Sequence, residues 1–177
     1  GRASIGLDAN PLAAFVTNAK QKAVTVEPEL LEQALKKILS SFSRNRAPVA
    51  TAYWTSNQVS YLERWFAPSY WSEVSRIRGA IESSDSEAAS IFLCLASDLL
   101  RDYSKQEPAD LRIRNRKSPY PDRSIIEAFE HQAERLIRNI AATKQVLPKV
   151  SNLGICHVAD VRDQASIRRA IGKKQFS

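Results

Sequence analysis

The sequence predicts an α/β fold in which two short strands, far apart in the chain, flank a long helical stretch. Near the start, the short apolar run Ser4–Leu7 ends at Asp8. Near the end, a second such run, Leu153–Ala159, ends at Asp160. Between the two runs, apolar residues recur mostly at helical spacing. We therefore expect a chain that is mostly α by content, with a small α/β part formed by its two ends.

The first two helices follow directly from their start signals and apolar spacing. Asn10 can cap a helix and Pro11 suits its first turn, so we expect a helix from Leu12 to about Val24. A second helix is expected to start at Glu27-Pro28 because seven apolar residues fall on one helical stripe: Leu30, Leu31, Ala34, Leu35, Ile38, Leu39 and Phe42.

An aromatic-rich segment follows the break in this pattern at Ser43–Thr51. Seven aromatic residues fall within nineteen positions: Tyr53, Trp54, Tyr61, Trp65, Phe66, Tyr70 and Trp71. Such residues can form the core where short helices cross, or they can stack on nucleic-acid bases. We favour core packing.

The second half of the chain is expected to hold two more long helices. Ser84–Glu87 has the spacing of a capping box and precedes an apolar helix from Ala88 to Tyr103. A longer helix is expected from about Asp122 to Val146, and a loop with a short helix after the second strand, over Val161–Ile171. The linker between the two long helices is the basic run Leu111–Lys117, followed by Ser118-Pro-Tyr-Pro121.

Composition points to a polyanionic partner and away from several other classes. The formal net charge is +7 and the pI is about 9.6, which favours nucleic acid but does not choose between DNA and RNA. We find no signal-peptide pattern and no apolar run near eighteen residues, so we expect no membrane segment and a cytoplasmic location.

The cysteines and histidines do not suggest a metal site. Cys94 and Cys156 are too few and too far apart for a metal knuckle or a disulfide scaffold, and we expect buried thiols. No second histidine shares the helical face of His131, so a surface histidine is favoured over a ligand. His157 lies within the strand pattern and is expected to pack in the sheet.

The first strand end carries a recognisable turn. An acid at the carboxyl end of a parallel strand in an open α/β sheet lies in the ligand crevice, where it can hold the hydroxyls of a ribose. The segment Gly6–Ala13 resembles the "G-x-D-x-N-P-x-A" turn of S-adenosylmethionine-dependent DNA amino-methyltransferases, which modify N4 of cytosine or N6 of adenine. The resemblance implies that Asp8, Ala9 and Asn10 belong to the cofactor site, with Asp8 on the ribose. Helix capping alone is the alternative explanation.

The second strand end is similar to another part of the same family. Ala159-Asp160-Val161-Arg162 resembles the "G-D-A-R" loop after the third strand, with Ala in place of the usual Gly. The resemblance implies that Asp160 accepts a hydrogen bond from the adenine amino group of S-adenosylmethionine and that Val161 lies in the same site. Capping of the following helix by Asp160 is an equally open alternative.

The resemblance implies a fragment of a Rossmann-like methyltransferase fold with a large helical insertion. Residues 1–24 would be the second strand and its helix, 25–150 the insertion, and 151–177 the third strand and its helix. The family's glycine-rich loop and its D/N/S-P-P-Y/W catalytic tetrapeptide are absent from the 177 residues, and Ser118-Pro-Tyr-Pro121 imitates the latter only superficially. We therefore expect an internal fragment that is inactive alone and holds no catalytic residue; the sequence does not reveal whether a restriction enzyme accompanies it.

Five cations around the basic linker are the candidate DNA contacts: Arg112, Arg114, Arg116, Lys117 and Arg123. They suit phosphate binding, although a solvated basic face is the alternative. A second cluster comprises Arg168, Arg169, Lys173 and Lys174. Two other functions stay open: an RNA methyltransferase acting on guanine amines, and a non-catalytic basic helical module that binds nucleic acid.

Overall fold

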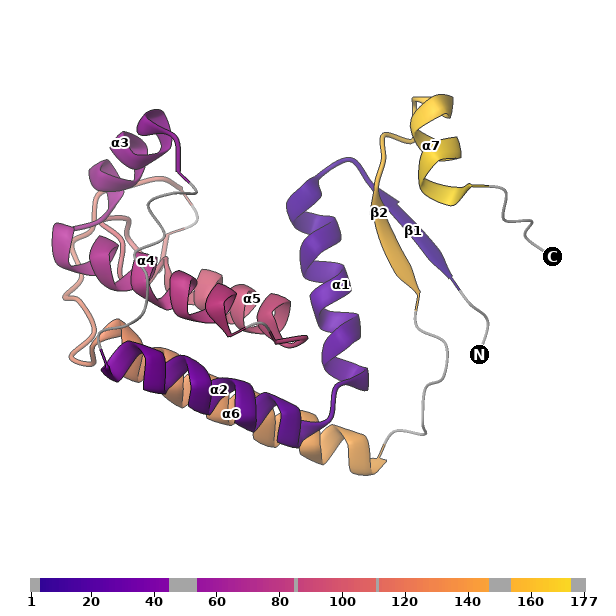
Figure 1. Ribbon diagram of the computed structural model, residues 1–177. Helices are drawn as coiled ribbons and strands as arrows, with labels where there is room; N and C mark the ends of the chain where they lie inside the picture. The colour runs from indigo at the N-terminus through magenta and orange to yellow at the C-terminus, as the bar shows by residue number, and fades with distance from the viewer. Residues whose placement is uncertain (1–3, 45–53, 85, 111, 147–153, 173–177) are drawn as a thin grey trace. The chain divides into compact units, whose positions relative to one another are not determined.

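The computed structural model describes residues 4–44, 54–84, 86–110, 112–146 and 154–172 (Figure 1). The described chain is mostly helical with one small parallel sheet, as its sequence predicts. The elements in order are β1 (Ile5–Asp8), α1 (Pro11–Thr25), α2 (Pro28–Ser43), α3 (Ser56–Trp65), α4 (Pro68–Ser83), α5 (Ala89–Leu99), α6 (Ile125–Val146), β2 (Ile155–Val158) and α7 (Gln164–Ile171).

The chain divides into two compact units. Unit 1 combines the two ends of the chain, Gly1–Glu27 and Ile140–Ser177, and unit 2 is the continuous segment Pro28–Asn139. Unit 2 begins near the predicted start of the insertion and ends before its predicted end. The functions assigned to these segments stay predictions.

In unit 1, β1 and β2 pair in parallel, and α1 lies alongside β2 (Figure 1). The register runs from Ile5 opposite Ile155 to Asp8 opposite Val158. Strands separated by most of the sequence therefore meet with their carboxyl ends at the same edge of the sheet.

The two outer edges of this sheet differ. On the side of β2 away from β1, the Asn18 side chain of α1 replaces a neighbouring strand: its Nδ2 donates to the Cys156 carbonyl at 2.8 Å, and its Oδ1 accepts from the Cys156 N–H at 2.8 Å. In a parallel pair, alternate residues face each neighbour, so the peptide groups of Ile5 and Leu7 face away from β2. Among the described residues, no strand pairs with β1 on that side.

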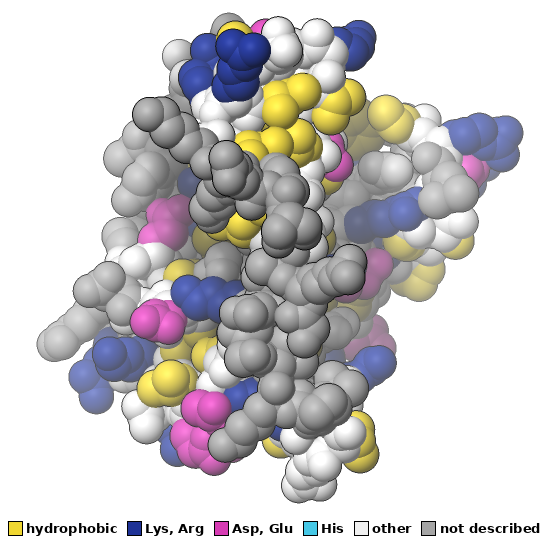
Figure 2. All heavy atoms as spheres, turned by 90° about the vertical axis from the view of Figure 1, so that its right-hand side faces the viewer, with side chains coloured by type: hydrophobic (Ala, Val, Ile, Leu, Met, Phe, Trp, Pro, Cys, Tyr) yellow, Lys and Arg dark blue, Asp and Glu magenta, His cyan; other side chains and the backbone are white. Residues whose placement is uncertain are grey.

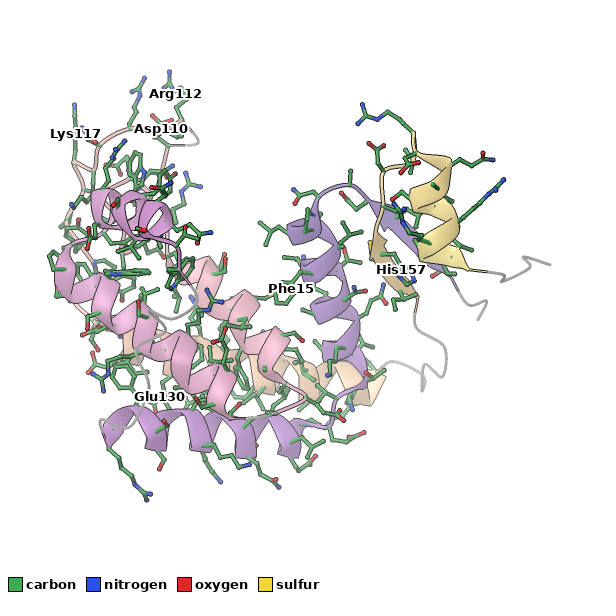
Figure 3. All side chains as sticks on the ribbon, turned by 45° about the horizontal axis from the view of Figure 1, so that its top comes forward. Phe15, Asp110, Arg112, Lys117, Glu130 and His157 are labelled. Atoms are coloured by element: carbon green, nitrogen blue, oxygen red, sulfur yellow. The ribbon has the colours of Figure 1, made fainter. Side chains whose placement is uncertain are left out.

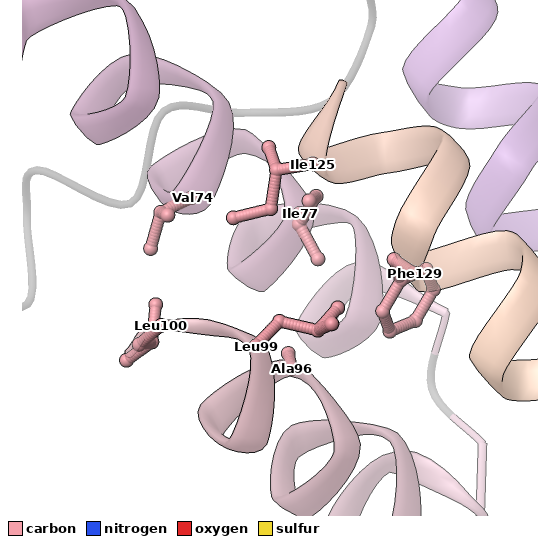
Figure 4. Close-up of a pocket in the computed structure, with 7 residues that line it drawn as sticks. All are labelled: Val74, Ile77, Ala96, Leu99, Leu100, Ile125 and Phe129. Carbon is pink, nitrogen blue, oxygen red and sulfur yellow. The ribbon is translucent and has the colours of Figure 1, made fainter. Parts of the chain in front are cut away.

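Unit 2 has a continuous apolar core built by its long helices. Helix α2 packs on α4 and α4 packs on α5. Phe92 of α5 and Phe129 of α6 are both fully buried, with ring centroids 6.1 Å apart. A gap of about 10 Å³ between α4, α5 and α6 is lined only by apolar side chains (Figure 4). It is too small and too apolar for a ligand.

The helix starts differ from the sequence prediction in two places. The predicted capping box at Ser84–Glu87 is wrong, because the Ser84 hydroxyl donates to the Ile81 carbonyl at the end of α4 and no side chain caps α5. A capping box is instead formed by Ser124 and Glu127, where the Glu127 carboxylate accepts from the Ser124 N–H at 2.9 Å. Helix α6 therefore starts at Ile125, and α5 is shorter than predicted.

Most of the aromatic segment packs within unit 2, as we expected. Trp54 stacks edge-on against Trp71, with ring centroids 5.6 Å apart, and Phe66 is buried. Tyr61 is an exception with 58% of its surface exposed. Tyr53 lies outside the described residues.

Candidate functional site

The first candidate site is the edge of the sheet where both strands end, which we call the acid edge. Asp8 is the last residue of β1, and Asp160 follows β2 by two residues. The Ala159 N–H donates to the Asp8 carbonyl at 2.9 Å, which extends the pairing to the residue before Asp160. The structure thus brings the two predicted cofactor acids to one edge of one sheet.

Asp8 and Asn10 make different hydrogen bonds in the turn between β1 and α1. Asp8 Oδ1 accepts from the Asn10 N–H at 2.7 Å, and Asn10 Oδ1 accepts from the Leu12 N–H at 2.9 Å. Asn10 is therefore the N-cap of α1, as predicted, and Pro11 occupies its first turn. The Asp8 side chain shapes the turn without capping the helix, and its Oδ2 has no hydrogen-bond partner among the described residues. Ala9 is exposed.

Asp160 is held by a neighbouring arginine. Its Oδ1 accepts from the Arg162 N–H at 2.9 Å and from Nε at 3.0 Å, and its Oδ2 accepts from Nη2 at 2.7 Å. The Arg162 guanidinium holds the pKa of Asp160 below its usual range. The capping alternative is wrong, because Asp163 is the residue that caps α7. Val161, the other predicted cofactor residue here, is exposed.

The acid edge can accept hydrogen bonds from neutral groups. A carboxylate oxygen has two acceptor sites, so Asp160 Oδ2 retains one beyond its bond to Arg162, and Asp8 Oδ2 retains both. Hydroxyl and amino groups suit such acceptors, whereas a phosphate would be repelled. In the described ranges we find no cluster of three or more His, Cys, Asp or Glu side chains suited to a metal.

The second candidate site is the segment from Ser104 to Ser124 in unit 2, which we call the basic loop. Its two arms pair as a short antiparallel hairpin through a bridge between Gln106 and Asn115. The Glu107 N–H donates to the Arg114 carbonyl at 2.9 Å, and the Arg116 N–H donates to the Lys105 carbonyl at 2.7 Å. The described residues of the loop are therefore held together by backbone hydrogen bonds, although they form neither a helix nor an extended sheet.

One turn of the loop is closed by a carboxylate. Glu107 Oε2 accepts from the N–H groups of Lys117 at 2.8 Å and Ser118 at 3.1 Å. These backbone hydrogen bonds, that of Lys117 foremost, hold the pKa of Glu107 below its usual value. The ionised Glu107 carboxylate thus connects the first arm of the hairpin to Lys117 and Ser118, which follow the second arm.

The Arg116 side chain makes its contacts within and beside the basic loop. Its guanidinium lies over the Tyr120 ring, 4.3 Å from the centroid. It also donates to four backbone carbonyls, those of Ser118 (3.0 Å), Asp102 (2.7 Å), Ser104 (3.2 Å) and Pro119 (2.7 Å). The sequence pattern places Arg116 with four other phosphate-binding candidates, but its hydrogen bonds make it an organising residue of the loop.

The other four candidate cations lie at the surface. Arg112 and Arg114 both pair with Asp110 at 3.2 Å, and their side chains are 72% and 57% exposed. Arg112 and Lys117 project away from the helices at the same end of unit 2 (Figure 3). Arg123 is exposed too, while its carbonyl accepts from the hydroxyl of Tyr103, whose burial raises its pKa.

A surface hollow of about 360 Å³ lies beside the basic loop. Its rim includes Asp102, which precedes the loop, Asp122 from the loop itself, and His131 and Gln132 from α6. His131 is exposed, in agreement with its prediction as a surface residue, and His157 is half-buried in β2. Of the second basic cluster, Arg168 is exposed and Arg169 pairs with Asp163 at 3.7 Å, while Lys173 and Lys174 lie outside the described residues.

Comparison with known proteins found no matching protein-family model, no matching curated protein and no matching solved structure. Within the described ranges, none of the helices combines the length and apolar character needed to cross a membrane.

Proposed function

We propose that this chain is part of an S-adenosylmethionine-dependent methyltransferase that modifies an exocyclic amine of cytosine or adenine in DNA. The observation that carries the proposal is the parallel register of β1 and β2, which brings Asp8 and Asp160 to one edge of a sheet. Ligands of open α/β sheets bind at this edge, beyond the carboxyl ends of the strands.

Each acid has the acceptor capacity that its proposed role needs. Asp8 Oδ2, without a partner among the described residues, would accept from a ribose hydroxyl. Asp160 Oδ2 would accept from the adenine amino group while Arg162 keeps the carboxylate ionised and oriented. Asn10 would act indirectly, by fixing the turn that carries Asp8.

The two edges of the small sheet also support a larger, Rossmann-like sheet. Asn18 occupies the outer edge of β2, as suits a terminal strand, whereas β1 offers unpaired peptide groups to a further strand. Hydrophobic side chains are exposed in the upper part of Figure 2, and Ile155 and Val158 of β2 are both about half exposed. In the proposal, additional elements of the fold cover them.

The basic loop would hold DNA. Arg112, Arg114, Lys117 and Arg123 are exposed, and they are the cations that we assign to phosphate contacts. Arg116 is left out of this set. The proposal includes a cytoplasmic location.

Binding of cofactor fragments tests the acid edge directly. The glycine-rich loop and catalytic tetrapeptide are missing from these residues, so ligand binding is a sharper test than turnover. We expect S-adenosylhomocysteine and adenosine to shift amide NMR signals around Asp8 and Asp160, and inosine, which lacks the amino group, to bind more weakly. Asp8→Ala and Asp160→Asn should weaken binding, and Asp98→Asn, an exposed site in α5, should not. Absence of any shift at the acid edge with adenosine would refute the cofactor site.

Salt-dependent nucleic-acid binding tests the basic loop. Removing one cation that binds a phosphate of duplex DNA should reduce the slope of log K against log salt by about 0.9. We expect Arg112→Ala and Lys117→Ala each to lower the slope by about this amount, and Arg138→Ala, an exposed arginine of α6, to leave it unchanged. Binding to DNA without response to the cofactor would favour a non-catalytic module, and tighter binding to RNA would favour an RNA methyltransferase.

A further inference from the structure

We infer that Arg162 reads the adenine of the cofactor directly, by donating from Nη2 to N7 of the ring while Asp160 accepts from the neighbouring amino group. This role rests on the proposed cofactor site and adds a second specificity-determining residue to it. Arg162 orients the Asp160 carboxylate, and the same contact leaves it a further donor beside that carboxylate.

The two side chains face each other edge to edge. Arg162 Nε donates to Asp160 Oδ1 at 3.0 Å, and Nη2 donates to Oδ2 at 2.7 Å, which is the parallel pairing of a guanidinium with a carboxylate. The turn that carries both side chains is also fixed, because the Arg162 N–H donates to Oδ1 at 2.9 Å and the Asp163 N–H donates to the Asp160 carbonyl at 3.0 Å. Side-chain and backbone hydrogen bonds therefore hold the pair in one orientation.

The outer side of this pair offers one acceptor and one donor next to each other. A carboxylate oxygen has two acceptor sites, and each terminal nitrogen of a guanidinium has two N–H groups. The contact between Oδ2 and Nη2 uses one of each, and neither atom has another partner among the described residues. Because both atoms are trigonal, the free acceptor site and the free N–H lie on the same side of the pair. The Arg162 side chain is 86% exposed, so a ligand can reach it.

An acceptor beside a donor is the complement of one edge of adenine. On this edge the amino group donates and N7 accepts, and proteins commonly bind it with the amide of Asn or Gln, which also offers one acceptor and one donor. Asp160 and Arg162 offer the same combination from two side chains. Their free sites diverge, which suits the amino group and N7 better than the more closely spaced amino group and N1. A purine with an oxygen in place of the amino group has two acceptors on this edge and would set that oxygen against the carboxylate.

The alternative is that Arg162 only orients Asp160 and does not touch the base. The two roles differ for a base that keeps the amino group and lacks N7. If Arg162 only orients the carboxylate, such a base should bind as well as adenine does. If Arg162 donates to N7, the base should bind more weakly, and the difference should depend on Arg162.

Binding of adenosine and 7-deazaadenosine tests the assignment, because the two nucleosides differ at the atom that Arg162 would contact. We would titrate the 177-residue chain with each and follow the amide NMR signals of residues 159–163. We expect the wild-type chain to bind 7-deazaadenosine about tenfold more weakly than adenosine, as suits one hydrogen bond from a charged group. Arg162→Ala should bind both weakly and with equal affinity. Arg168→Ala, which removes an exposed arginine of α7, should keep the wild-type preference.

The outcomes distinguish this role from the cofactor site beneath it. If adenosine shifts no signal at the acid edge, both the cofactor site and the role of Arg162 are overturned. If adenosine binds but wild type does not distinguish it from 7-deazaadenosine, or if the preference persists in Arg162→Ala, only the role of Arg162 is overturned. Weaker binding of 1-deazaadenosine in place of 7-deazaadenosine would overturn the assignment to N7. The wild-type comparison needs no substitution, and matching denaturation midpoints would verify that the variants remain folded.

Discussion

Replacing Arg116 by Ala should loosen the basic loop more than any other single cation replacement in it. The side chain donates to four backbone carbonyls and stacks on Tyr120. Hydrogen bonds from a charged group contribute about 1.5–3 kcal/mol each when buried, and an exposed cation–π contact contributes about 0.5–1 kcal/mol. Arg116 is only half-buried, so water can solvate the released carbonyls. We therefore expect a total loss of about 2–4 kcal/mol in the free energy of unfolding of unit 2.

Two matched variants isolate the role of this guanidinium. Arg114→Ala removes a neighbouring arginine whose ion pair with Asp110 is exposed, and such pairs contribute about 0–1 kcal/mol. Arg116→Lys keeps the charge but lacks the planar fork, so it should lose most of what Arg116→Ala loses. Urea denaturation followed by tryptophan fluorescence provides the measurement, because all three tryptophans lie in unit 2.

The refuting result is an unfolding free energy that falls no further for Arg116→Ala than for Arg114→Ala. If Arg116→Ala also keeps its stability and lowers DNA affinity with a smaller salt slope, Arg116 is a phosphate contact after all. If Arg116 instead organises the loop, Arg116→Ala should cause the largest loss of stability, and replacement of the exposed cations should cause the largest change in the salt dependence of DNA binding.

Three further predictions test other parts of the structure. The depressed pKa of Glu107 means that its ionised form stabilises the loop above the usual carboxyl pKa, and that this stabilisation is lost as the pH falls through the folded-state pKa. The protection of the Lys117 amide against hydrogen exchange, relative to the intrinsic rate at each pH, should fall on acidification, and Glu107→Gln should abolish that dependence; a pH-independent protection factor would contradict the assignment. Phe129→Ala should reduce the unfolding free energy by about 3–5 kcal/mol and Tyr61→Ala by far less, and equal denaturation midpoints would contradict the core described. Asn18→Ala removes two hydrogen bonds to the Cys156 backbone, which should lower the free energy of unfolding by about 1–3 kcal/mol and speed up thiol labelling of Cys156. An unchanged labelling rate would argue that Asn18 does not hold the edge of β2.

The strands and most helices could be predicted because their signals are local. Asp8 and Asp160 each end a short apolar run, and Pro11 and Pro28 mark the first helical positions of α1 and α2. The pairing of β1 with β2 is different, because it depends on backbone hydrogen bonds between segments at opposite ends of the chain. Asn18 offered a weak signal, since asparagine is unfavourable within a helix, but its partner could only be found in space.

The capping boxes show where local patterns compete. Ser84–Glu87 and Ser124–Glu127 have the same spacing, yet only the second forms a capping box. Ser84 is still close enough to the end of α4 for its hydroxyl to bond back to Ile81, so it closes the preceding helix and is unavailable to the next. The distance from the previous helix end therefore decides which pattern becomes a cap.

The basic loop shows why charge in a sequence does not by itself locate a binding surface. Five neighbouring cations have equal formal charge, and nothing in their spacing separates Arg116 from Arg112. The fold distinguishes them. Backbone carbonyls on both sides of the hairpin accept hydrogen bonds from the Arg116 guanidinium, whereas the Arg112 side chain is exposed to water. The Arg116 guanidinium has little to gain from a phosphate, since four of its five N–H donors are already bonded to carbonyl oxygens. If DNA binds here, affinity should therefore follow the exposed cations, and Arg116 should influence it only through the shape of the loop that carries them.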